Sequence, residues 1–76
     1  MSITSNVNSN VRQSSTDKFI SKYSAENGIT LLIDPALPKN DGLCYPDLKE
    51  IHLSQKYTSS KHKIAVFLHE VAHIRV

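Results

Sequence analysis

Apolar and polar residues follow two different periods along this chain, and each period predicts a type of secondary structure. From Ile64 to Ile74 apolar residues recur every three or four positions, which is the spacing of one buried helix face. No Gly or Pro interrupts residues 59–76. We therefore expect one helix over this stretch, with its first turn capped by a hydroxyl group from residues 58–60.

A second helix is expected near the start of the chain, from about Thr16 to Asn27. Ser14 and Asp17 stand at the spacing of a capping box, and Gly28 follows as a stop signal. We expect this helix to pack across a small sheet.

Three short segments between these helices have the composition of strands. Residues 29–33 are β-branched and apolar, residues 43–45 form a second short run, and residues 49–54 alternate between apolar and polar. In the last segment, Ile51 and Leu53 are expected to face the same side of the sheet. The order predicts an α+β fold with an N-terminal helix, a small three-stranded sheet and a C-terminal helix.

Length, composition and charge limit the classes of protein to which the chain can belong. Its 76 residues make one small domain, and the Ser- and Asn-rich residues 1–15 are expected to form a flexible lead before a domain over residues 16–76. A net charge of +2, from scattered Lys and Arg, is too small to indicate nucleic acid or an anionic membrane surface. The single cysteine, Cys44, excludes an internal disulfide and fits a reducing compartment. Because no apolar signal or spanning segment is visible, we expect a cytoplasmic protein without membrane partners.

The candidate chemistry lies in the C-terminal helix, where residues 69–73 read H-E-x-x-H. His69 and His73 are four residues apart, so their side chains project from the same helix face and can both reach one Zn²⁺ at about 2.0–2.1 Å. Glu70 is placed to take a proton from a metal-bound water, which is the arrangement of a zinc peptidase. The alternative is two buried histidines hydrogen-bonded to neighbours on an ordinary core helix. Four apolar residues gather on the opposite side of the helix: Ile64, Phe67, Val71 and Ile74.

A catalytic zinc normally has three protein ligands and an open position for water, and this helix supplies two ligands. His62 lies about 10.5 Å along the helix axis from His69, too far to share its metal. His52 is a better candidate for the third ligand, although a surface histidine is the favoured interpretation. Cys44 could also be a ligand or nucleophile, but a small buried side chain is the favoured interpretation. Three acidic residues have the setting of turn residues, although any of them could contact a metal: Asp34, Asp41 and Asp47.

Over roughly residues 16–76 the chain resembles the minimal core of gluzincin-type zinc metallopeptidases. Within that class the similarity is to SprT-like and ImmA/IrrE-like proteins and to small phage metallopeptidases. It rests on Gly42-Leu43-Cys44-Tyr45, on Lys49-Glu50-Ile51-His52-Leu53-Ser54 and on residues 64–74. The first two pieces resemble the G-x-C and I-x-L-S strand pair that precedes the active-site helix in SprT-like domains.

The resemblance implies a zincin-like core, with zinc ligands at His69 and His73 and a general base at Glu70. It also implies a peptide or protein substrate that lies against an edge strand at residues 49–54 by β-augmentation. The family's third ligand, a Glu or in some relatives a His, lies on a later helix that does not follow His73 here. We therefore expect the chain to be the N-terminal part of a longer enzyme. The alternatives are a catalytically silent zinc-binding domain and a metal-free protein-interaction domain.

Overall fold

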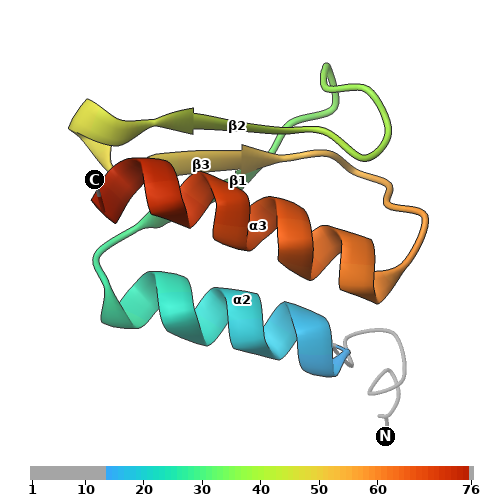
Figure 1. Ribbon diagram of the computed structural model, residues 1–76, viewed down its shortest axis with the longest axis horizontal. Coiled ribbons are helices and arrows are strands. Elements are labelled where there is room, and N and C mark those ends of the chain that lie inside the picture. Colours follow the sequence, from blue (N-terminus) through green and yellow to red (C-terminus); the bar gives the residue numbers. More distant parts are fainter. Residues whose placement is uncertain (1–13, 76) are drawn as a thin grey trace, which may run out of the picture.

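Two helices lie on one face of a three-stranded sheet in the computed structural model, which describes residues 14–75 (Figure 1). In chain order the elements are α2 (Ser15–Glu26), β1 (Thr30–Ile33), β2 (Gly42–Tyr45), the short 3-10 helix η1 (Pro46–Leu48), β3 (Glu50–Leu53) and α3 (Ser60–Arg75). This order confirms the expected α+β arrangement. Within residues 14–75, neither helix combines the length and the apolar character needed to cross a membrane.

Local signals place the ends of α2 as expected. The Ser14 hydroxyl accepts a hydrogen bond from the Asp17 backbone N–H at 3.1 Å, which satisfies one of the unpaired donors of the first turn. Asn27 caps the other end, and Gly28 follows with a φ of +67°, a left-handed conformation that glycine adopts at low cost. The expected flexible lead lies outside the described residues except for Ser14 and Ser15, which cap and begin this helix.

The sheet has the strand order β1-β3-β2, so β3 is its central strand. β3 pairs in parallel with β1 and antiparallel with β2, and Ile51 is opposite both Leu31 and Cys44. The expectation of an edge strand at residues 49–54 is therefore wrong. In the central position both edges of β3 are hydrogen-bonded, by β1 and by β2, and its apolar residues Ile51 and Leu53 are completely inaccessible to solvent under the helices. The edges of the sheet are β1 and β2.

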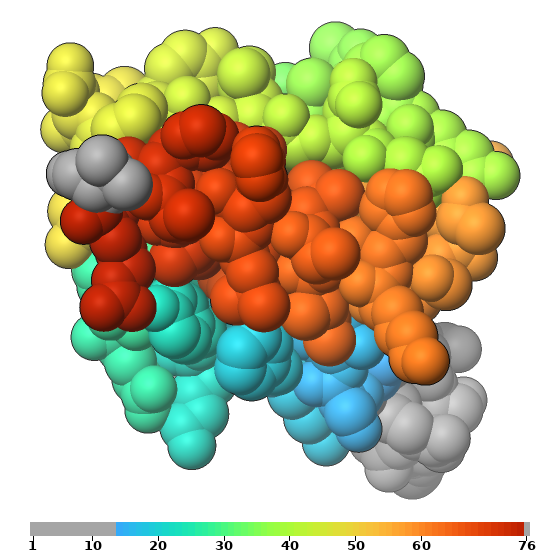
Figure 2. Space-filling model, viewed as in Figure 1, coloured from blue at the N-terminus to red at the C-terminus, as the bar shows by residue number. Residues whose placement is uncertain are grey.

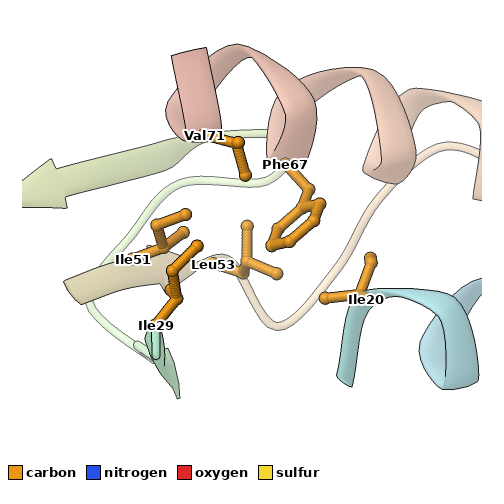
Figure 3. Close-up of a cluster of buried hydrophobic side chains, with 6 residues drawn as sticks. All are labelled: Ile20, Ile29, Ile51, Leu53, Phe67 and Val71. Carbon is orange, nitrogen blue, oxygen red and sulfur yellow. The ribbon is translucent and has the colours of Figure 1, made fainter. Parts of the chain in front are cut away.

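The core lies between the sheet and the two helices (Figure 3). Phe67 of α3 points into its centre, and its ring meets the edges of Phe19 and Tyr23 of α2 at centroid distances of 6.5 and 5.9 Å. These ring contacts pack α3 against α2, while Phe67 also lies in the core next to the sheet. Six buried side chains form this core: Ile20, Ile29, Ile51, Leu53, Phe67 and Val71.

Candidate metal centre

The three candidate residues of the motif, all in helix α3, differ in their exposure to solvent. His69 and His73 are exposed, whereas Glu70 retains only 9% of its accessible surface. Successive residues differ by about 100° around a helix, so Glu70 turns toward the sheet while the histidines four residues apart share the outer side. Phe67 and Val71 are buried as expected, which confirms the predicted apolar side of the helix.

The two histidine side chains converge at their tips. Nε2 of His69 lies 3.2 Å from Nε2 of His73, and the rings are nearly perpendicular at 86°. Two nitrogen ligands of a tetrahedral zinc, each at about 2.0–2.1 Å, are separated by about 3.3–3.4 Å. The observed spacing therefore fits two ligands of one metal ion. It also fits a hydrogen bond between two neutral imidazoles, one donating and the other accepting.

A third protein ligand is not found in the described part of the chain. Among residues 14–75, no group of three His, Cys, Asp or Glu side chains is placed to hold a metal ion. His52 lies on the sheet face away from α3, because it alternates with the buried Ile51 and Leu53. Its suggested contribution to the metal site is therefore wrong.

His52 instead forms a cluster with two carboxylates on this outer face. Its Nε2 lies 2.8 Å from Glu50 Oε1, and its Nδ1 lies 3.3 Å from Asp34 Oδ2. The hydrogen bond with Glu50 raises the pKa of His52. Burial opposes this rise, and the weaker hydrogen bond with Asp34 and the charges of both carboxylates add to it. The pKa of Asp34 is lowered, first by the hydrogen bond from the Ala36 N–H and then by His52. The cluster connects the end of β1 to β3, so its role is structural.

Glu70 faces strand β2, and its surroundings there include a thiol and a phenol. Burial raises the pKa of Cys44, and the negative charge of Glu70 raises it further. Burial likewise raises the pKa of Tyr57, with smaller contributions from the charges of Asp41 and Glu70. Cys44 is a free cysteine that is half-buried and packs against the core, so the favoured interpretation of a small buried side chain is met only in part. Among the hydrogen bonds and ion pairs within residues 14–75, none involves the Glu70 carboxylate.

A cleft of about 600 Å³ begins at His69 and Glu70 and runs toward the start of α3. Gly42 and Val66 line the part of the cleft next to Glu70, and His62 lies at its other end. In Figure 2 the surface of α3 is open to solvent between the atoms of the β2 region and those of α2. His69 is the histidine of the motif that lines this cleft.

Hydrogen bonds fix the wall of the cleft that precedes β2. The Asn40 side chain donates to Thr58 Oγ1 at 2.9 Å and accepts from the Thr58 N–H at 2.7 Å. The Tyr57 hydroxyl donates to the Asp41 carbonyl and accepts from the Ser54 N–H at 2.9 Å. Sequence reasoning missed this wall. The available signal was Asn40 in a turn-rich segment, because Asn is one of the few residues that adopt a left-handed backbone, here with a φ of +71°.

The interpretation of this centre rests on its own geometry. Comparisons with family models, curated proteins and solved structures give no significant match. The features that a function has to use are two converging imidazoles, a buried carboxylate on the adjacent side of the same helix, and an open cleft that leads to both.

Proposed function

We propose that α3 is the active-site helix of a gluzincin-type zinc metallopeptidase with a zincin-like core. The observation that supports this most strongly is the 3.2 Å separation of the Nε2 atoms of His69 and His73 beside a buried Glu70. Two histidines in an ordinary core helix are buried and bonded to neighbouring elements. These two are exposed, and the polar partner of each is the other.

Each residue of the motif then has a separate task. His69 and His73 would hold Zn²⁺ through neutral imidazole nitrogens. When bound, the ion would lower the pKa of a coordinated water toward about 7 and polarise the scissile carbonyl group. Glu70 accepts a proton from the attacking water at a carboxylate oxygen and then donates it to the leaving amine. Its burial against β2 keeps the carboxylate in one position without competing bonds from residues 14–75.

The substrate of this site is an extended peptide, and strand β2 is the element that supports it. β2 is an edge strand next to the cleft, and within the described residues it pairs only with β3. Its free edge therefore offers N–H and C=O groups to a peptide by β-augmentation. The strand proposed for this role is thus β2, and not the central segment at residues 49–54.

A catalytically silent zinc-binding domain is the second candidate. The observation in its favour is that residues 14–75 provide only two converging ligands. A site with fewer than three protein ligands binds zinc more weakly and holds the activated water less firmly. A chain that binds zinc and cleaves no peptide would support this candidate over the peptidase.

Replacing Glu70 with Gln tests the peptidase directly. We expect Glu70→Gln to bind zinc as the unmodified chain does, because the ligands are unchanged. Hydrolysis of a fluorogenic peptide library should fall by about 10²–10⁴-fold, the usual contribution of general acid–base catalysis. Glu50→Gln is the matched control, because this acid lies on the other face of the sheet and should leave the turnover rate unchanged. Equal hydrolysis by Glu70→Gln and the unmodified chain would refute the role of Glu70.

A further inference from the structure

Strand β2 and helix α3 pack against each other, and Gly42 of β2 lies close to Val66 and Glu70 of α3. We infer that Gly42 is a positioning residue for Glu70: its lack of a side chain lets α3 lie close enough to β2 to hold the carboxylate at the inner wall of the cleft. This inference rests on the proposed function, because it assigns a part in the same site.

The space at Gly42 is too small for any side chain. A Cβ atom added there would lie 2.6 Å from Val66 Cγ1, a distance that real Cβ contacts do not show. The same atom would lie 3.4 Å from Glu70 Cγ and 3.5 Å from Glu70 Oε2, which are ordinary contacts. The backbone does not require glycine here, because among the described glycines only Gly28 has a positive φ. The close approach of the two elements is therefore the reason for glycine at this position.

Neither side of this contact can move away at low cost. Val66 is β-branched and lies within α3, where a single χ1 rotamer is strongly preferred. On the other side Gly42 pairs with Leu53 of β3, and the preceding carbonyl of Asp41 accepts hydrogen bonds from the Tyr57 hydroxyl and the Ser54 N–H. An added methyl group at position 42 is therefore expected to push α3 outward.

Such a displacement is expected to change the position of Glu70 and to leave the spacing of the two zinc ligands unchanged. Glu70 is one helical turn after Val66 and moves away from β2 together with it. The spacing of His69 and His73 is set within the helix and is retained. Gly42→Ala should therefore lower kcat while zinc affinity changes little. A misplacement of about 1 Å typically costs about 100-fold in rate.

The test compares Gly42→Ala, Val66→Ala and the double variant in the full chain. We expect Gly42→Ala to lower kcat about 100-fold, with the zinc dissociation constant, measured by competition with a chromophoric chelator, unchanged. In the double variant the Val66 methyl groups are absent, so kcat should return to the value of Val66→Ala alone. An unchanged kcat in Gly42→Ala, or a loss that the second substitution does not restore, would overturn the inference.

Alkylation of Cys44 by iodoacetamide provides a second readout that needs no catalysis. Because the charge of Glu70 helps to raise the pKa of Cys44, moving the carboxylate away should increase the alkylation rate. We expect a faster rate in Gly42→Ala than in the unmodified chain, and no further increase when Gly42→Ala is added to Glu70→Gln. An unchanged rate in Gly42→Ala, or a full increase in the Glu70→Gln background, would overturn the role of Gly42. A chain that binds zinc but cleaves no peptide would refute the proposed function alone, since the alkylation rates would still test the position of Glu70.

Discussion

Adjacent residues in α3 have opposite exposures, and this difference organises the candidate site. His69 projects into solvent, whereas Glu70 is turned toward strand β2. The 100° step of the helix accounts for the direction of each side chain, but the depth of Glu70 depends on how closely β2 approaches. A metal ligand has to be reachable from solvent, and a general base benefits from a fixed position. The 100° step from His69 to Glu70 gives the candidate ligand an exposed position and the candidate base a buried one.

A second residue-scale feature is the His52 cluster, which predicts how stability depends on pH. Glu50 and Asp34 raise the pKa of His52 in the folded chain above its ordinary value of 6.5. Its contribution to the free energy of unfolding is therefore complete below pH 6.5 and is lost as pH rises through the raised pKa. Asp34 acts in the opposite direction: its pKa lies below 3.8, so its contribution is lost only as pH falls below that value. We expect the thermal midpoint to be highest between these limits.

The His52→Gln variant isolates this effect from the other histidines. Thermal unfolding followed by circular dichroism between pH 5 and pH 9 should show a decline on the alkaline side in the unmodified chain. The decline should be smaller in His52→Gln, because the neutral amide does not titrate. Identical pH profiles for the two proteins would contradict the stabilising role of the cluster.

The residues that face the core could be predicted from the sequence. The contacts between residues of different helices and strands could not. The alternation around Ile51 and Leu53 and the apolar side of α3 are local patterns, and both are confirmed. The place of His52 between two carboxylates depends on how β1 lies against β3, because Asp34 is 18 positions away in the sequence. The narrow contact at Gly42 likewise depends on packing between elements. The pattern of apolar and polar residues does not predict these contacts between elements.

At the scale of elements, the connections around β2 determine the shape of the cleft. Asn40 has a left-handed φ of +71° and clamps Thr58 through both atoms of its side-chain amide. The segment before β2 is thereby tied to the segment before α3. Residues 40–42 line one side of the cleft, and Ser59 and helix α3 line the other. Rigid connections of this kind allow two short elements to keep a fixed spacing.

Two substitutions at Asn40 test separately the hydrogen bonds to Thr58 and the left-handed backbone conformation. Asn40→Gly keeps the left-handed backbone but removes two hydrogen bonds, and should lower the free energy of unfolding by about 1–2 kcal/mol. Asn40→Ala removes the same hydrogen bonds but keeps a Cβ in the left-handed region without the polar side chain that makes it tolerable, so it should be about 1 kcal/mol less stable than Asn40→Gly. Urea unfolding of both variants, with Lys39→Ala as a control in the same loop, measures the difference. Equal stability of Asn40→Ala and Asn40→Gly would show that the φ of residue 40 imposes no strain.

The elements themselves were predictable from local signals, and their order in the sheet was not. Ser14, Asn27 and Gly28 provide caps and stops at the ends of α2, and the order of helices and strands follows from such signals. Strand order is decided by which apolar face is buried most deeply, which becomes known only when the helices pack. Residues 49–54 were expected at an edge but form the central strand, and the proposed peptide-binding role is therefore assigned to the edge strand β2.

The whole molecule is small, and its described core consists of six side chains. A chain of this size buries only about 60% of its unfolded surface, so its free energy of unfolding is expected to be low. An ion that binds only the folded chain adds stability, by about 2.7 kcal/mol at a concentration 100 times its dissociation constant. Metal binding at His69 and His73 should therefore raise the thermal midpoint as well as complete the site.

Zinc content is the measurement that tests the central claim most directly. We would purify the chain without chelator, supplement it with zinc, remove unbound metal and measure zinc per chain by elemental analysis. We predict about one zinc per chain in the unmodified protein and in His62→Ala, whose side chain is two helical turns from His69. We predict none in His69→Ala or His73→Ala. A chain that retains no zinc, or one whose zinc content is unchanged by loss of either histidine, would contradict the assignment of this helix as a metal site.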